Sequence, residues 1–94
     1  MPRSVYSIRA EASLTVHLSD IEKLLTLKTI TPKIEEAIRE HIAVARAAVV
    51  MAHEHATAAG HLNDAFQREH EQRLEGLAGM ERRVNDFLRE NPPR

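Results

Sequence analysis

The chain has 94 residues, and 13 Lys and Arg balance 14 Asp and Glu to give a net charge of −1 with histidine neutral. This balance argues against a nucleic acid partner, because dedicated nucleic-acid-binding domains carry a basic surface. The sequence has no cysteine, which excludes disulfides and cysteine-ligated zinc, and no run approaches the roughly 20 apolar residues of a membrane span, so we expect a cytoplasmic protein without a membrane partner.

Residues 5–18 alternate apolar and polar side chains, from Tyr6 and Ile8 to Val16 and Leu18. A period of two is typical of a β-strand with one buried face. We expect one long strand rather than a hairpin, because no Gly, Asn or Pro supplies a turn within the segment. The alternative is that the segment is partly helical, or disordered until a partner arrives.

A strand without a partner in its own chain leaves two rows of unpaired backbone groups, which native proteins avoid. No other segment is typical of a strand, so we expect antiparallel pairing with the same strand of a second copy across a twofold axis. The first expected partner is therefore the chain itself, as a homodimer or higher even oligomer. The residues expected to carry self-association are Ile8, Leu14 and Val16 in the strand, and Ile38, Ile42 and Val49 in the long helix that follows.

Two helix starts come next. Ser19 and Glu22 match a capping box, in which each side chain bonds the backbone amide of the other residue, so we expect a short helix over 20–28. Thr31 followed by Pro32 predicts the start of a second helix, because Thr caps well and Pro suits the first helical position.

The helix expected over 32–59 carries a heptad seam, which is typical of packing against other helices. From Ala43 to Ala52 this helix is apolar nearly all round, with Arg46 as its only charge. That pattern predicts a helix covered on more than one side. The seam residues are Ile38, Ile42, Ala45, Val49, Ala52, Ala56 and Ala59.

A last helix is expected over 64–89, after a stop at Gly60, with 90–94 as a tail. Gly76 and Gly79 interrupt it at a cost of about 1 kcal/mol each relative to Ala, which makes sense if another backbone passes close by. The alternative is one continuous helix over 32–89. The apolar stripe of the last helix is Phe66, Leu74, Leu77, Met80, Val84, Phe87 and Leu88.

These elements predict a single domain over 1–94 of mainly α class. It has an N-terminal β-strand paired across a dimer, a short helix and two long antiparallel helices.

The six histidines raise a metal hypothesis that their spacing does not support. Two ligands on one helix must lie three or four residues apart to share a face, and no pair among residues 17, 41, 53, 55, 61 and 70 does. The sequence also has no Glu-x-x-His, no nucleophile elbow and no phosphate-binding glycine loop. We therefore expect no enzyme, no cofactor, and no catalytic or metal-ligating residue. A metal or small-ligand site at a subunit interface stays open as an alternative function.

The stretch LTVHLSDIEKLLTLKTITPKIEEAIREHI, residues 14–42, resembles in outline the ribbon-helix-helix repressors. In that family a ribbon of two paired strands enters the DNA major groove. The resemblance implies a dimeric DNA-binding regulator or antitoxin that reads bases with Arg9, Thr15 and His17. The chain departs from the family in its longer strand, its shorter first helix and the missing glycine between the helices.

The leading hypothesis is a small homo-oligomeric helical module for protein–protein interaction. Such a protein acts by presenting a surface to itself and to another protein, as an adaptor, scaffold, assembly factor or inhibitor.

Overall fold

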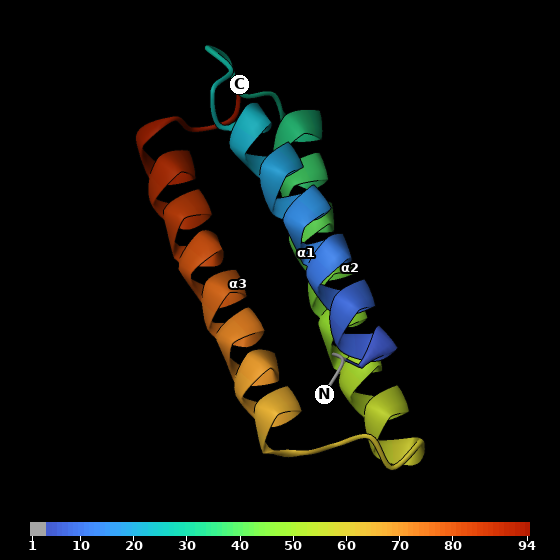
Figure 1. Cartoon of the computed structure of the whole chain (residues 1–94). Coiled ribbons are helices and arrows are strands. Elements are labelled where there is room, and N and C mark those ends of the chain that lie inside the picture. Colours follow the sequence, from blue (N-terminus) through green and yellow to red (C-terminus); the bar gives the residue numbers. More distant parts are fainter. Residues whose placement is uncertain (1–3) are drawn as a thin grey trace.

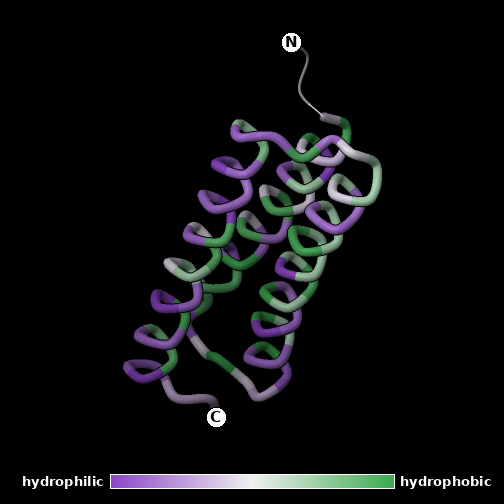
Figure 2. The backbone as a smooth tube through the Cα atoms, turned by 90° about the horizontal axis from the view of Figure 1, so that it is seen from below, coloured by the Kyte–Doolittle hydropathy of each residue, from purple (hydrophilic) through white to green (hydrophobic). Residues whose placement is uncertain are grey.

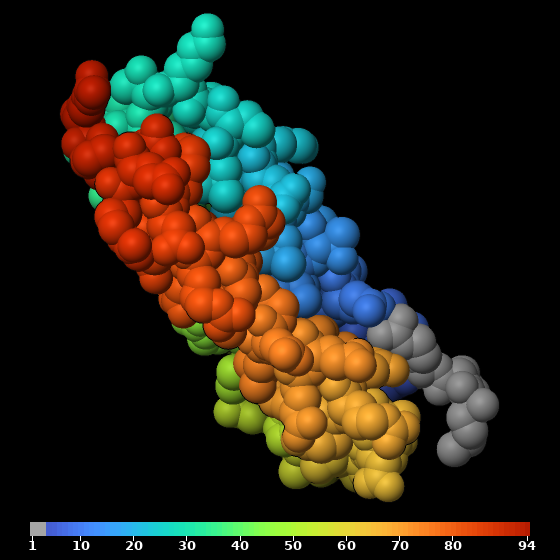
Figure 3. All heavy atoms as spheres, turned by 90° about the vertical axis from the view of Figure 1, so that its left-hand side faces the viewer, coloured from blue at the N-terminus to red at the C-terminus, as the bar shows by residue number. Residues whose placement is uncertain are grey.

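A computed structural model describes residues 4–94 as three helices joined by short loops. Helix α1 spans Val5–Leu24, α2 spans Pro32–Ala58 and α3 spans Asp64–Glu90. Helices α1 and α2 run antiparallel and side by side, and α3 lies along the pair (Figure 1). The bundle is a rod of 48 × 18 × 18 Å, with α3 forming a continuous ridge along one side of it beside α1 (Figure 3).

The N-terminal β-strand predicted over 5–18 is wrong, because these residues form most of α1. The predicted short helix over 20–28 is wrong as a separate element, since α1 continues through Ser19 to Leu24. Within residues 4–94 there is no strand. The predicted pairing of N-terminal strands across a dimer is therefore wrong as well.

A helical pattern lies within the alternation that predicted a strand. The hydroxyl of Ser4 caps α1 by accepting a hydrogen bond from the amide of Tyr6, at 3.2 Å. The buried positions of α1 then follow at spacings of three, four and seven residues, which is the period of a helix face. They are Ser7, Ala10, Leu14 and Ile21. Their small or polar members hide this stripe among the larger apolar side chains of the other turns.

The predicted boundaries of the two long helices are confirmed within one residue. Thr31 caps α2, its hydroxyl accepting from the amide of Ile34 at 3.2 Å, and Asn63 caps α3 through a 2.8 Å bond from the amide of Phe66. Gly60 has a φ of 72° and ends α2 in a conformation that favours glycine. The alternative of one continuous helix over 32–89 is therefore wrong.

The core follows the heptad seam of α2. All predicted seam residues are buried except Ala59, which is the exposed C-terminal cap. In Figure 2 hydrophobic segments recur turn by turn along each helix. The largest core cluster lies at the end of the rod near the α1–α2 loop and consists of Ile21, Ile30, Ile38, Ile42, Met80, Val84 and Leu88.

The predicted stripe of α3 is confirmed for five of its seven residues. Phe87 is half-buried and Leu74 is 36% exposed, whereas His70 and Arg73, in the turn before Leu74, are buried. Polar side chains thus occupy two core positions at one end of the rod.

At the opposite end the amide of Arg94 donates to the carbonyl of Ile30, at 2.8 Å. The last residues are thereby tied to the loop between α1 and α2. None of the three helices combines the length and apolar character that a membrane crossing requires among the residues described.

Candidate functional site

The residues predicted to carry self-association fall into two groups. Ile8 and Val16 are exposed on α1, by 50% and 57%. The other four are buried within the single chain, where they hold the helices together. They are Leu14, Ile38, Ile42 and Val49.

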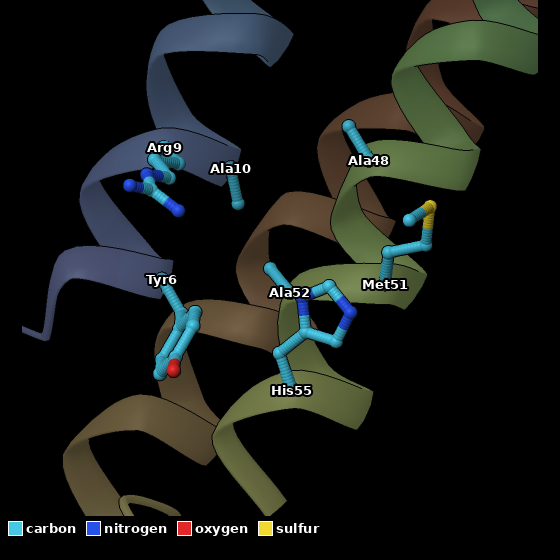
Figure 4. Close-up of a pocket in the computed structure, with 7 residues that line it drawn as sticks. All are labelled: Tyr6, Arg9, Ala10, Ala48, Met51, Ala52 and His55. Atoms are coloured by element: carbon cyan, nitrogen blue, oxygen red, sulfur yellow. The ribbon is translucent and has the colours of Figure 1, made fainter. Parts of the chain in front are cut away.

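A hollow of about 270 Å³ opens between the first half of α1 and the last third of α2 (Figure 4). Alanines form its floor, so each helix contributes only methyl groups where a larger side chain would fill the space. Figure 4 shows the ring of Tyr6 from α1 and that of His55 from α2 at one end of it. The lining residues are Tyr6, Arg9, Ala10, Ala48, Met51, Ala52 and His55.

A second hollow of about 180 Å³ lies further along the same side of α2. Its lining residues are His17, Ala37, Glu40, His41 and Val44. On α2 the positions 37, 41, 44, 48, 51 and 55 from the two hollows follow alternating spacings of four and three. They form a second heptad stripe beside the buried seam, and we call the surface that the two hollows share the α1–α2 groove.

The outward edge of the groove is apolar. Val44, Val50 and Met51 of α2 are 44%, 40% and 51% exposed, and the neighbouring alanines at 43 and 47 are also exposed. The sequence predicted that this part of α2 is covered on more than one side. Within residues 4–94, α1 and α3 cover two sides of α2, as predicted, and the apolar residues on its outward side stay exposed.

Opposite charges lie near the two ends of the groove. Arg9 is exposed and lines the first hollow, level with Met51. Glu40 is exposed and lines the second hollow, three turns earlier on α2. The groove is therefore positive at one end and negative at the other.

Two histidines meet across the groove. The Nδ1 atoms of His17 on α1 and His41 on α2 are 2.9 Å apart, and the ring centroids are 5.2 Å apart. Both side chains are half-buried. No spacing in the sequence indicates this pair, because it joins two helices and depends on their register.

A buried polar cluster joins α1 to α3 at the end of the rod where α1 begins. Arg73 donates from Nη1 to the hydroxyl of Ser7 at 3.1 Å and lies 3.5 Å from Glu69. The hydroxyl of Ser7 donates in turn to the Glu69 carboxylate. The heptad spacing of 66, 70, 73 and 77 is a signal that could have placed residues 70 and 73 in the core.

His70 lies beside this cluster and stacks against His53 of α2, with ring centroids 4.2 Å apart. Burial lowers the pKa of His70, and the neighbouring His53 and Arg73 lower it further. His53 is held by Gln67, whose Oε1 lies 3.1 Å from the Nε2 of the ring. The arrangement favours a neutral His70, so the cluster serves packing between the helices.

The DNA-reading residues implied by the ribbon-helix-helix resemblance do not form a common surface. Arg9, Thr15 and His17 lie on α1, where Arg9 and His17 line the two hollows of the α1–α2 groove and Thr15 points to another side of the helix. That family's ribbon is a pair of strands, and α1 is a helix. In the part of the chain that the structure describes, no group of three or more His, Asp or Glu residues surrounds a common point.

Comparison of the chain with protein-family models, curated proteins and solved structures finds no match.

Proposed function

We propose that this chain is a self-associating helical interaction module, and that the α1–α2 groove is the surface through which two copies pair. The exposed apolar row on the central turns of α2 is the observation that carries the proposal. Covering such a row removes apolar area from water, which stabilises an association by roughly 25 cal/mol per Å² before the costs of binding. The occupant that best fits the groove is a second copy of the chain.

The charges at the groove ends support this choice. Glu40 and Met51 are eleven residues apart, or about 16 Å along the helix, and Arg9 lies level with Met51. A twofold axis midway, near residues 45 and 46 of α2, brings Arg9 of each copy beside Glu40 of the other. The pairing is isologous, so both ion pairs form at once.

The shape of the groove supports the same arrangement. Val44 and Met51 project from α2. The small side chains of Ala37 and Ala48, on the same stripe of α2, leave gaps beside them. In an antiparallel pair of α2 helices, larger residues of one copy enter gaps of the other, as knobs enter holes in a coiled coil. The two hollows are then filled from outside by the partner.

The test is the mass of the particle in solution, measured by sedimentation velocity from about 1 to 200 μM. The wild type is expected to form dimers within this range, and Val44→Glu or Met51→Glu to remain monomeric with an unchanged circular dichroism spectrum. Leu62→Glu is the matched control, because Leu62 is 40% exposed in the loop outside the groove. A wild type that stays monomeric at 200 μM would contradict the proposal.

A charge exchange tests the arrangement of the two copies. Arg9→Glu or Glu40→Arg alone places like charges together and is expected to weaken the dimer, by about 0.2 to 1 kcal/mol for each exposed pair. The double variant restores both pairs with reversed sign and is expected to recover the affinity. Equal weakening in the single and double variants would contradict this twofold axis but not dimerisation itself.

A further inference from the structure

We propose that His17 and His41 form a two-histidine site for a late first-row divalent cation, Cu(II) or Ni(II), held between α1 and α2. Both histidines belong to one chain, so the site forms without the dimer proposed above. The hollow beside it lies in the same groove, so a partner copy that fills the hollow would compete with the cation.

The distance between the two nitrogens fits a metal ion with right-angle coordination. Metal–imidazole bonds are about 2.0 to 2.1 Å long, so two of them at 90° place their nitrogens about 2.9 Å apart. The Nδ1 atoms of His17 and His41 are 2.9 Å apart. A tetrahedral angle would require about 3.3 Å with the same bonds. Right-angle coordination by nitrogen ligands is typical of Cu(II) and Ni(II). In the usual affinity order for such ligands, Cu(II) also binds more tightly than Zn(II).

Without a metal, one hydrogen bond joins the two Nδ1 atoms. One Nδ1 carries the hydrogen and donates it, and the other accepts it through its lone pair. On metal binding the donor ring moves its proton from Nδ1 to Nε2 through solvent, and both Nδ1 lone pairs face the ion.

The surroundings leave room for an ion and its water ligands. A hollow of about 180 Å³ adjoins the pair and is lined on α2 by Ala37, Glu40 and Val44. The carboxylate of Glu40 places negative charge in this hollow, which favours a cation. Since the protein supplies two ligands, water completes the coordination, and we expect exchangeable binding rather than a closed structural site.

The other histidine contact on the rod differs in kind. His53 and His70 contact each other through their ring faces, tilted by 33° with centroids 4.2 Å apart, and Nε2 of His53 is already paired with Gln67. The cation of Arg73 lies close to His70 and disfavours a second cation there. The geometry therefore points to the pair of residues 17 and 41.

The experiment uses untagged, metal-free chain and one metal salt at a time, Cu(II), Ni(II) or Zn(II), in a non-coordinating buffer at pH 7.5. Calorimetric titration with glycine as a competitor for Cu(II) gives the stoichiometry and affinity, and electron paramagnetic resonance of the Cu(II) sample reports the nitrogen ligands. We expect one metal per chain, with Cu(II) bound most tightly. His17→Gln and His41→Gln are each expected to weaken binding by at least about tenfold.

His61→Gln is the matched control, because His61 is exposed outside the groove and its loss should leave the affinity unchanged. A second measurement guards against variants that fold poorly. Saturating Ni(II) should raise the melting temperature of the wild type and of His61→Gln, because an ion held by two helices stabilises only the folded chain. Binding weaker than about 100 μM by the wild type, or equal binding by wild type and both groove variants, would overturn the proposal.

Discussion

Arg73 of α3 donates a hydrogen bond to the hydroxyl of Ser7 in α1, and the two residues are only 5% and 1% exposed. This bond and the Ser7–Glu69 bond are polar contacts between two helices whose core is otherwise apolar. Nε and Nη2 of Arg73 have no hydrogen-bond partner among residues 4–94. The guanidinium is thus already short of partners, and a further loss should be costly.

We predict that Ser7→Ala lowers the free energy of unfolding by about 1 to 3 kcal/mol, the usual cost of leaving a buried polar group without its partner. Urea denaturation followed by circular dichroism measures the change. Ser19→Ala is the control on the same helix, because Ser19 is exposed and its replacement should change stability by less than about 0.5 kcal/mol. Arg73→Met should cost less than Ser7→Ala, since it removes the buried charge together with its unpaired atoms. The opposite order would contradict this description of the cluster.

The glycines of the chain should respond to alanine in opposite directions. A Cβ added at Gly76 meets no atom within 4 Å, and one at Gly79 meets only the Arg82 side chain, at 3.7 Å. Gly76→Ala and Gly79→Ala should each stabilise the chain by about 1 kcal/mol through better helix propensity. Gly60→Ala should destabilise it by about 1 kcal/mol, because the φ of 72° strains any residue with a Cβ.

Thermal unfolding of the three single variants shows whether each melting temperature rises or falls. Loss of stability in Gly76→Ala would indicate a close backbone neighbour, such as a second copy.

The stability of the chain should fall as the solution is acidified below neutrality. The pKa of His70 is lowered in the folded chain, first by burial and then by His53 and Arg73. The unfolded chain, whose histidine pKa is about 6.5, therefore binds protons before the folded chain does. The stability contributed by neutral His70 is complete above pH 6.5 and is lost as the pH falls below it.

Urea denaturation at pH 7.5 and 5.5 measures this loss above the range in which most carboxylates titrate. His70→Gln should reduce the difference in unfolding free energy between the two pH values, and His61→Gln at an exposed position should leave it nearly unchanged. An equal pH dependence in wild type and His70→Gln would show that other groups cause the loss.

The sequence predicted α2 and α3 well because their signals agree with one another. Thr31 and Pro32 give a start with a physical cause, Gly60 gives a stop, and the seam of α2 keeps a strict period between them. Each signal is local, and the apolar stripe that the sequence indicates is the one that is buried in the bundle.

The segment of α1 was mistaken for a strand because its alternation is real but does not decide which residues are buried. Ile8 and Val16, which define the alternation, are half exposed in the bundle, whereas Ser7 and Ala10 are buried. Ala10, Glu11 and Ala12 are poor strand formers and good helix formers, and this helix propensity agreed with the structure.

The site could be predicted only in part. The nearly all-round apolar pattern of α2 over residues 43–52 predicted cover on more than one side, and α1 and α3 supply two such sides. The apolar residues of this stretch that stay exposed form the outward edge of the groove. The meeting of His17 with His41, and of Ser7 with Arg73, depends on the relative height of two helices. No pattern within one helix carries that information.

The unequal ends of the rod imply that the bundle does not open evenly. Ile21, Ile38 and their large aliphatic neighbours fill the end near the α1–α2 loop, whereas the end where α1 begins is filled by alanines, by Phe66 and by the polar Ser7, His70 and Arg73. Amide protons near the polar end should exchange with deuterium through local fraying, and those near the aliphatic end only through global unfolding. We therefore expect the end where α1 begins to open first, and the first hollow of the groove lies at that end.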